Sequence, residues 1–482
     1  MAGAGSIQVD TPLVSVVLFK LVGRKDGVSE RYVGSPMAVD LTPVLGEGGV
    51  IRTVKSVHEP AGGFSISVGD SGYTVGDDTV YALVEPGDMV EIRATRFPER
   101  YAGRKLPLIM RGFVQAVRRS EAIGGDGVPE RTVVITGQDA GRFWLINQIL
   151  FELSYLDSNP NPYLTTFHMQ AATGIDPNMM PVSEFMRQVT ERVINKQVEQ
   201  LSVFSSRQIA KFRVEATVKQ GIASNIMVAP FQGPVWNLVE AFADRPWNEV
   251  FVEDEDAGPV LRFREAPYKG IDGKFIMPNA VEPGTIVVEA DKVLALDVQR
   301  SDARVANFFW VPPGSSMLHT AQMVNVASLQ AGEPLDFEYG NNKPELYGVR
   351  RMQLETRLLP NDLASLPSLL PPSQQGAAGD KVVLWHKVRG AQLKAMNRDN
   401  VVLEEGSAML QGVEDLKAGR FLRLKRGELT SEAYMPRVSH NIAPLRSWTT
   451  NVTLERGTGF LERSKFTGSP YWAEGRRGPY SK

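Results

Sequence analysis

Residues 86–141, PGDMVEIRATRFPERYAGRKLPLIMRGFVQAVRRSEAIGGDGVPERTVVITGQDAG, decide the fold. Apolar residues recur at every second position in short runs, and Gly, Pro and Asp lie between the runs. Alternation of this period is typical of strands with one buried face, and the separating residues are typical of turns. We therefore predict a strand meander that forms the second half of a small β-barrel.

The same order returns in residues 418–459, AGRFLRLKRGELTSEAYMPRVSHNIAPLRSWTTNVTLERGTG. A turn glycine opens a basic strand in both stretches, at Gly87 and at Gly419. An aromatic-containing strand follows and ends at a valine, over 113–117 and over 434–438. A Thr-rich strand then closes each stretch. We interpret the two stretches as a diverged duplication, which predicts two related β-barrels.

Composition restricts the class of protein. The chain has 482 residues, 43% of them hydrophobic, which is enough for about three globular domains. Its formal net charge is -2, so bulk charge does not favour nucleic acid or an anionic membrane as a partner. It has no cysteine, which excludes disulfides, thiolate metal sites and cysteine nucleophiles. The first residues lack the apolar run of a signal peptide, so we expect folding in a cytoplasm.

The pattern predicts a mainly β fold with an α+β insert: two related β-barrel domains, an α+β domain and smaller connecting elements. We expect these divisions along the chain: 1–139, first β-barrel; 140–284, α+β insert domain; 285–360, β-rich segment leading into the second barrel; 361–400, connector loop and helix; 401–460, closing strands of the second barrel; 461–482, extended C-terminal arm.

Several elements of the middle region are predicted from their period. Residues 140–156 are apolar almost all round, which favours a buried helix capped by Asp139. We also expect amphipathic helices over 181–201 and from Gly233 onward, and a hairpin over 248–267. Residues 360–379 are rich in Pro, Ser and Gly and are expected to form a loop. The helix that follows is expected to use one face made of Leu384, Val388, Ala391 and Ala395.

The succession of these segments resembles the tail or baseplate hub family of tailed bacteriophages. The resemblance rests on the Pro-Trp-x-Glu-x-Phe and LRFREAP hairpin (247–267), on SDARVANFF and YGVRR, and on the closing YMPRVSHNI and WTTNVTLERG. It covers roughly residues 10–460, and its specificity lies in the order of the segments and in the duplicated barrel. The family's fold is two related β-barrels with an α+β insert.

The resemblance implies a structural protein of the virion, built in the bacterial host cytoplasm, without enzymatic activity and without a cofactor. It implies a homotrimeric ring that adapts a six-fold tail tube to a three-fold central spike or tip. The implied partners are other copies of the chain, the tail tube protein, the central spike or tip protein and the surrounding baseplate proteins. DNA would pass through such a ring without specific binding, and no small-molecule substrate is implied.

Other chemistry has little support in the sequence. No two histidines stand at metal-ligand spacing; they are His58, His168, His319, His386 and His440. The acidic run 253–256 falls on a predicted hairpin tip, where carboxylates are normally solvated. The stretch 157–168 begins like a calcium loop but has proline and histidine where glycine and glutamate are needed. We therefore expect no catalytic residue, no cofactor-binding residue and no metal ligand.

Two alternatives remain open. One is a tail-associated peptidoglycan hydrolase or peptidase, which would need a cleft with carboxylates or histidine in the middle region. The other is a barrel-based nucleic-acid-binding protein, which would need a basic, aromatic-lined barrel face. Aromatic residues interleaved with arginines near the C-terminus could stack on bases, but we interpret them as contacts of a partner-bound arm; the candidates are Tyr471, Trp472, Arg476, Arg477 and Tyr480.

Removal of residues 463–482 is expected to leave the fold intact and to weaken assembly. The arm has no apolar period that would pack on a core, whereas Tyr and Trp contribute more than other residues to interfaces. Thermal unfolding of the truncated chain, compared with its association by light scattering, tests this. A truncated chain that fails to fold would show instead that the arm is part of the core.

Overall fold

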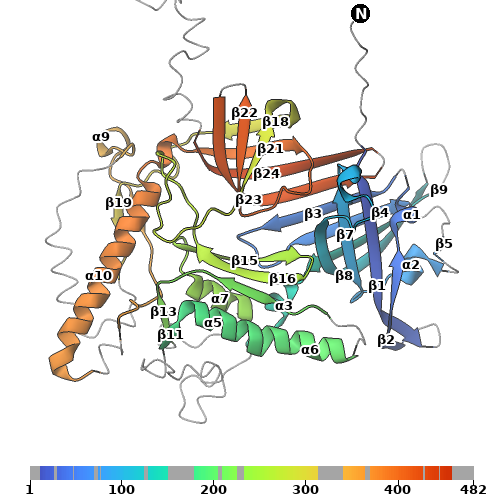
Figure 1. Ribbon diagram of the computed structural model, residues 1–482, viewed down its shortest axis with the longest axis horizontal. Helices are drawn as coiled ribbons and strands as arrows, with labels where there is room; N and C mark the ends of the chain where they lie inside the picture. The colour runs from blue at the N-terminus through green and yellow to red at the C-terminus, as the bar shows by residue number, and fades with distance from the viewer. Residues whose placement is uncertain are drawn as a thin grey trace, which may run out of the picture.

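The computed structural model describes residues 11–25, 30–46, 48–69, 74–75, 78–123, 129–149, 179–204, 209–224, 233–312, 340–363, 370–426, 429–444 and 446–458. The fold is mainly β, and thirteen strands belong to one sheet. In Figure 1 the N-terminal strands lie at the right, the C-terminal strands at the top and the middle region below them. This arrangement agrees with the fold class expected from the sequence.

The N-terminal strands form a row that we call the first module. Helix α1 (Thr42–Leu45) contacts both β1 and β4, so it packs against strands from opposite parts of the row. The Leu41 N–H donates to the Val16 carbonyl at 2.8 Å, which fixes α1 against β1. The strands of the row are antiparallel and lie in the order β1 (Leu13–Lys25), β7 (Met89–Thr95), β8 (Leu108–Ile123), β9 (Pro129–Asp139), β4 (Gly63–Gly69) and β3 (Val50–Ser56), with β2 (Glu30–Asp40) beside β1.

The C-terminal strands form the second module. Its first and last strands are separated in the chain only by the 3-10 turn η5 (Ala290–Lys292), so the row must curl until these strands lie near each other, although they do not pair. The order of the row is β17 (Thr285–Glu289), β22 (Arg420–Arg426), β23 (Leu429–Ala443), β24 (Ser447–Gly457), β21 (Glu404–Gln411) and β18 (Val293–Gln299). All neighbours are antiparallel except β17 and β22, which are parallel.

Five strands of the two modules match in spatial order, in chain order and in direction. The row β7-β8-β9-β4-β3 corresponds to β22-β23-β24-β21-β18. The outermost strands differ, because β1 is antiparallel to β7 whereas β17 is parallel to β22. The two stretches that share a sequence pattern are therefore equivalent strand meanders, β7-β8-β9 and β22-β23-β24.

The match extends to single residues. Gly87 and Gly419 both have positive φ, 103° and 82°, a conformation that glycine adopts without strain. Two residues later, Met89 lies opposite Phe113 in the first module, and Phe421 lies opposite Tyr434 in the second. Each glycine N–H donates to the carbonyl of the residue that follows the aromatic residue, at 2.9 and 2.8 Å. A bulge in the ladder follows in both strands.

A cross-strand ion pair occupies the same place in both meanders with its charges exchanged. Glu91 on β7 lies opposite Arg111 on β8, with a nitrogen to oxygen distance of 2.8 Å. At the equivalent place Arg423 on β22 lies opposite Glu432 on β23, at 2.6 Å. The attraction of opposite charges across a strand pair does not depend on which strand carries which sign. An ion pair that is kept while its two charges change places is expected when duplicated strands diverge in sequence.

Strand pairing also joins the two modules to each other. Residues 437–442 of β23 continue past β22 and pair with residues 51–56 of β3. The tip of the β23–β24 hairpin carries Ile442 and Trp448 into the core of the first module, where both are fully buried. The Arg96 guanidinium of the first module donates to the Trp448 carbonyl at 2.8 Å. The modules therefore share one sheet and part of one core.

The insert lies beside both modules. Its three-stranded sheet has the order β12 (Arg213–Ala216), β16 (Gly258–Glu265) and β15 (Asn248–Glu255). Its helices are α5 (Val182–Val189), the π-helical turn η3 (Thr190–Ile194), α6 (Asn195–Phe204) and α7 (Val235–Ala243). The predicted helical stripe is confirmed: its buried members are Phe185, Met186, Val189 and Ile194, and Val193 is partly buried against them. The predicted hairpin is β15–β16.

The remaining elements are short, apart from α10 (Pro372–Asn397). They are β5 (Thr74–Val75), β6 (Asp78–Thr79), α2 (Val80–Leu83), η1 (Pro98–Tyr101), α3 (Arg142–Ile146), β10 (Gln148–Ile149), β11 (Met179–Pro181), β13 (Ile222–Ser224), β14 (Gly233–Pro234), β19 (Phe308–Trp310), α9 (Pro344–Tyr347), β20 (Arg351–Gln353) and η8 (Asn400–Val402).

Two predicted helices need correction. The helix expected over 140–156 ends after the five residues of α3, and the chain continues as strand β10; residues 150–156 lie outside the described residues. An apolar run does not distinguish a buried helix from a buried strand. Asp139 does not cap it, because Asp139 belongs to β9 and its side chain accepts from the N–H groups of Gly62 and Gly141, both at 2.8 Å.

Helix α10 differs from its prediction in both extent and orientation. It begins at Pro372, so part of the expected loop over 360–379 is helical. The residues expected to form its buried face point outward: Leu384 is 61% exposed, Val388 is 40% exposed, and Ala391 and Ala395 are exposed. The buried face instead includes Trp385, His386, Arg389, Leu393 and Met396. Because that face includes the polar residues His386 and Arg389, the apolar pattern of the sequence did not identify it.

Replacement of Trp448 by alanine is expected to lower the free energy of unfolding by roughly 3–5 kcal/mol, because the indole is fully buried in the shared core. Denaturant unfolding measures the loss. Leu346→Ala is the control, since Leu346 is 70% exposed and its loss should stay within about 0.5 kcal/mol. An equally small loss for Trp448→Ala would contradict the shared core.

Candidate assembly interface

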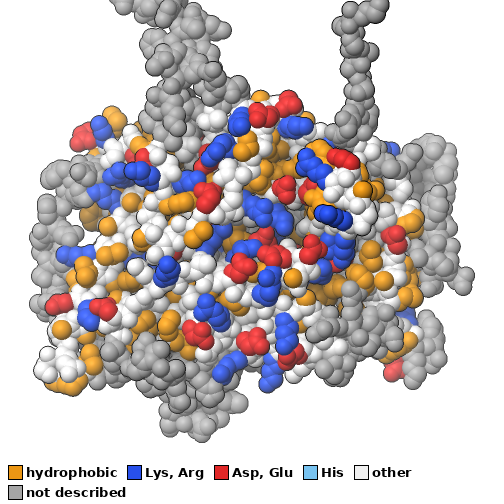
Figure 2. Space-filling view, in the orientation of Figure 1, with side chains coloured by type: hydrophobic (Ala, Val, Ile, Leu, Met, Phe, Trp, Pro, Cys, Tyr) orange, Lys and Arg blue, Asp and Glu red, His pale blue; other side chains and the backbone are white. Residues whose placement is uncertain are grey.

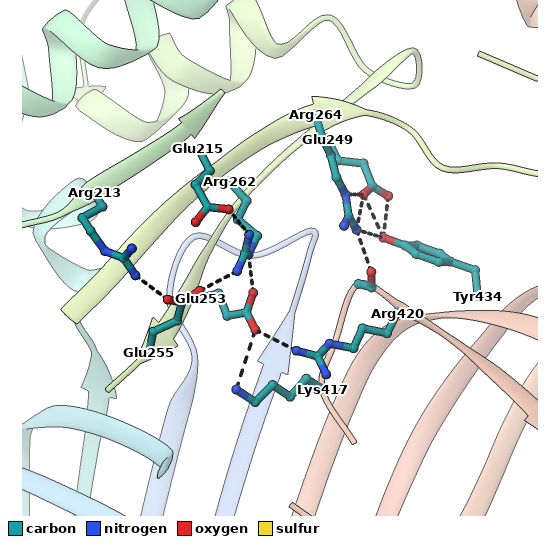
Figure 3. Close-up of polar contacts among 11 residues, drawn as sticks. Arg213, Glu215, Glu249, Glu253, Glu255, Arg262, Arg264, Lys417, Arg420 and Tyr434 are labelled. Atoms are coloured by element: carbon teal, nitrogen blue, oxygen red, sulfur yellow. Dashed lines mark hydrogen bonds and ion pairs between the residues drawn. The ribbon is translucent and has the colours of Figure 1, made fainter. Parts of the chain in front are cut away.

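The tip of the β15–β16 hairpin, residues 254–258, lies where the insert meets the two modules. Figure 3 shows the charged residues of the hairpin reaching toward the strands that follow residue 417. The contacts come from three parts of the chain that are far apart in sequence. This junction decides how the modules and the insert are oriented to one another.

One buried contact fixes the hairpin to the second module. The Tyr434 hydroxyl on β23 donates to the Glu249 carboxylate on β15, 2.7 Å from the nearer oxygen. Arg264 on β16 donates to the same carboxylate at 3.1 Å and to the Gly419 carbonyl at 2.7 Å. Burial, followed by the charge of Glu249, raises the pKa of Tyr434 well above its ordinary value. The phenol therefore stays a hydrogen-bond donor at any physiological pH.

A second contact lies nearer the hairpin tip. The Glu253 carboxylate pairs with Arg262 and lies 3.8 Å from the Lys417 ammonium and 3.6 Å from the Arg420 guanidinium. Burial alone would raise the pKa of Glu253, but these cations, Arg262 first, hold it below its ordinary value. Three cations around one carboxylate keep it ionised and tie β15 to the start of β22.

Strand β12 of the insert is held to its neighbours by two cations, Arg262 and Arg213. Arg262 also pairs with Glu215 on β12 and with Glu255 on β15. Arg213 on β12 pairs with Glu255 as well. The charges alternate across the three strands, so the small sheet is stiffened on the face that meets the modules.

The hairpin tip also reaches the first module. Arg93 on β7 pairs with the Asp256 carboxylate and with Glu91, which lies 2.6 Å from its Nε. Lys105 and Arg111 complete the surroundings of Glu91, each at 2.8 Å. Burial acts to raise the pKa of Glu91, but hydrogen bonds from these three cations lower it to about 2. The tip is thus held by both modules.

Between these contacts, two carboxylates, Asp139 and Asp254, lie near one lysine. Lys55 on β3 pairs with Asp139 on β9; burial acts to lower the pKa of Lys55, but the charges of Asp139 and then of Asp254 raise it. Burial, followed by the negative charge of Asp139, raises the pKa of Asp254 to about 7. One lysine therefore serves two carboxylates at the point where the insert meets the first module.

The acidic run 253–256 is at the hairpin tip, as predicted, but the expectation that it is merely solvated is wrong. Glu253 and Glu255 are half-buried in ion pairs, and Asp256, although exposed, pairs with Arg93. The basic partners come from other parts of the chain, so no local pattern could show them. The contacts are structural ion pairs between elements of one chain.

The described histidines have structural surroundings. His440 is buried between the Thr450 hydroxyl, at 2.8 Å, and the Leu416 carbonyl, at 3.0 Å. Burial lowers the pKa of His440 and of His386 to about 4 in each case. His58 is half-exposed, 4.0 Å from a Glu455 carboxylate oxygen. Among the described residues, no three His, Asp or Glu side chains gather as a metal site would require.

Some predicted residues cannot be placed. The candidate arm residues Tyr471, Trp472, Arg476, Arg477 and Tyr480 lie outside the described residues, as do His168, His319 and the calcium-loop-like stretch 157–168.

The surface in Figure 2 mixes both signs of charge. On that face Lys and Arg side chains alternate with Asp and Glu side chains, with apolar residues scattered among them. Within the described parts of the chain, no helix is long and apolar enough to span a membrane.

Among the described residues, the end of β8 and one edge of β18 have no partner strand, and sequence reasoning missed both. Strand β8 is 16 residues long, but β7 pairs with it only as far as Phe113. Strand β18 pairs with β21 on one side, and no other strand of the described chain pairs with its opposite edge. The sequence could have indicated the unpaired end of β8, because the strand-like run that includes Phe113 is longer than the run of the preceding strand, β7.

No protein-family model matches the chain, and no curated protein matches it. Among solved structures, it is similar to a tail protein from Neisseria meningitidis MC58, with 11% identity and a TM-score of 0.45 over 92% of this chain and 96% of that one. It is also similar to the 43 kDa tail protein of prophage MuSo2 from Shewanella oneidensis, with 10% identity and a TM-score of 0.42 over 93% and 98%.

A third similar structure is the prophage tail protein gp18 from Listeria monocytogenes EGD-e, with 6% identity and a TM-score of 0.41 over 91% of this chain and 94% of that one. All three are tail proteins by name.

Asp254→Asn is expected to stabilise the protein more at pH 8 than at pH 5. The pKa of Asp254 is raised on folding, so the folded chain holds this proton more tightly than the unfolded chain. The group's contribution to stability is therefore greatest below about pH 4 and falls as the pH rises through about 7. Asparagine removes the charge and with it this loss.

Denaturant unfolding of both proteins at the two pH values measures the effect, which should be on the order of 1 kcal/mol. Glu345→Gln, at an exposed site on α9, is the control for removal of a carboxylate. If Asp254→Asn changed the free energy of unfolding by the same amount at both pH values, the raised pKa of Asp254 would be contradicted.

Proposed function

We propose that this protein is the structural hub of a phage tail or baseplate. In this proposal it forms a homotrimeric ring in the virion that joins a six-fold tail tube to a three-fold central spike or tip. The observation that carries the proposal is the match of five strands between the two modules, in order and direction. The sequence resemblance supports the same role.

The match matters because of symmetry. Three copies of a chain with one docking surface cannot offer equivalent contacts to six tube subunits. Three copies that each carry two equivalent modules offer six quasi-equivalent surfaces in one ring, while the parts that occur once remain three-fold. The insert and the C-terminal arm occur once in the chain. They are available to the spike and to the surrounding baseplate proteins, with Tyr471, Trp472, Arg476, Arg477 and Tyr480 as the proposed arm contacts.

We include in this proposal the division of the chain into two barrels, an insert, a connector and an arm. DNA would pass through the ring without specific binding. In support, the formal net charge is -2, and the face in Figure 2 has no area of one sign that would retain a polyanion. We also propose a structural role without catalysis, with assembly in the host cytoplasm. No described contact favours the hydrolase or the nucleic-acid-binding alternative.

The proposal predicts a ring in the assembled particle with three copies of the chain, in which both modules of every copy face the tube. Electron cryomicroscopy of the particle shows the copy number and the contacts. Six copies in the ring, or one module per copy facing the tube, would contradict it. Mass photometry of the isolated protein adds the expected trimer mass; a stable monomer there is compatible with assembly on the spike or tube.

A further inference from the structure

The contact between the two modules uses one edge from each. The second module contributes the part of β23 that extends beyond β22, residues 437–442. The first module contributes the outer edge of β3, residues 51–56. The contact is a regular antiparallel ladder, so it depends mainly on backbone groups. A ladder of this kind tolerates divergence of side chains.

Each module also carries the edge that the other one uses. Strand β8 is the equivalent of β23, and it too extends beyond its neighbour β7, over residues 114–123. Strand β18 is the equivalent of β3, and its outer edge is likewise without a strand among the described residues. Helix α2 also contacts β8, and its Tyr81 ring lies 5.9 Å from the Arg119 guanidinium. Neither edge carries proline, the residue that commonly blocks edge pairing.

We infer that these two edges bind each other between copies: β8 of one copy pairs in antiparallel fashion with β18 of the next. This inference rests on the proposed ring and names the surface that closes it. A contact between two different surfaces of one chain closes into a ring when the rotation between copies allows it. Every junction between neighbouring modules around the ring is then an antiparallel ladder: β23 with β3 inside each chain, and β8 with β18 between copies.

The register between copies follows from the register inside the chain. Val438 lies opposite Lys55 in the internal ladder. Val117 is the equivalent of Val438, because both stand four residues after the matched aromatic residue and opposite equivalent positions of the next strand. Arg300 is the equivalent of Lys55, because Leu296 matches Ile51 through the pairs that these residues make with Ala408 and Ile66.

Transfer of the register therefore places Val117 opposite Arg300 of the next copy and, further along, Ser120 opposite Asp297. In the same register Ile123 lies opposite Leu294. These are the most exposed large apolar residues of the two edges, 80% and 54% exposed, and their pairing extends the transferred register two residues beyond the last internal pair, Ile442 with Ile51. Leu294 stands at a bulge in the ladder with β21, which leaves it projecting from the strand.

Charge fits the same register. Asp297 lies opposite Ser120 and diagonal to Arg118, and diagonal neighbours on one face are within reach of a long side chain. A second copy is thus a better occupant than an unrelated strand, because one chain presents both complementary edges and already contains one such ladder. Unpaired edges of this length would otherwise promote uncontrolled association.

A cysteine pair tests the register directly, because the chain has no cysteine of its own. Residues directly opposite in a ladder have Cβ atoms about 4.5–5.5 Å apart, close enough for a disulfide after small adjustment. The full-length double variant Ser120→Cys, Asp297→Cys is expected to form disulfides between copies under mild oxidation, up to a covalently closed trimer. Non-reducing electrophoresis and mass spectrometry identify the products.

The matched control is Ser120→Cys with Val298→Cys, which moves one cysteine to the opposite face of the strand. It is expected to give at least about tenfold less cross-linked product. Equal cross-linking in both variants, a disulfide confined to single chains, or no cross-link would each overturn the inferred ladder. The hub role is tested separately by the ring seen in the particle, so it can stand if the ladder fails.

A second pair of variants tests the ladder without cysteines, in case the cysteine variants fold poorly. Leu294→Asp is expected to weaken association about tenfold or more, because it puts a charge opposite Ile123 of the next copy. Leu346→Asp places the same charge at a 70% exposed leucine away from both edges and is expected to leave association unchanged. Circular dichroism confirms folding of both, and sedimentation measures association. The same association for both variants would overturn the ladder.

Discussion

The backbone ladder between β23 and β3 is the contact on which the rest of the structure depends. It makes one sheet of two modules that are far apart in the sequence, and it carries Ile442 and Trp448 from the second module into the core of the first. Every hydrogen bond of such a ladder is made by groups that all residues possess. The two modules could therefore diverge in sequence while the way in which they join was retained.

A ladder alone would leave the modules free to twist against each other, and the insert restricts this. The β15–β16 hairpin contacts the second module through Glu249 and Glu253 and the first through Asp256. Exposed ion pairs contribute little to stability, but half-buried pairs with several partners fix orientation. The angle between modules determines how many fit around a ring, so these contacts bear on the symmetry of the proposed assembly.

Much of the fold can be predicted from the sequence where the signal is local. The turn glycines Gly87 and Gly419 and the equal spacing of aromatic residue and valine were enough to predict both meanders. The apolar stripe around Phe185 and the hairpin after Trp247 were predicted in the same way. These features depend on residues within a few positions of each other, and the period of the apolar residues reports them.

The failures have physical reasons. The predicted face of α10 was wrong because its true buried side includes Arg389, whose guanidinium lies 3.2 Å from the Asp244 carboxylate of another element. The role of the acidic tip depends on Lys417 and Arg420, more than 150 residues away in the sequence. The ladder between modules has no local signal at all, since edge pairing is made by the backbone.

Hydrogen exchange, followed through association of the purified chain, tests the central claim most directly. Alternate amides of residues 115–123 and 295–299 point away from β9 and β21. We expect these outward amides to exchange quickly in the monomer and to become protected together in the oligomer. Amides of residues 437–442, already in the internal ladder, should be protected in both states and serve as the reference. Protection of only one of the two edges, or association that leaves both exchanging quickly, would contradict pairing of β8 with β18 between copies.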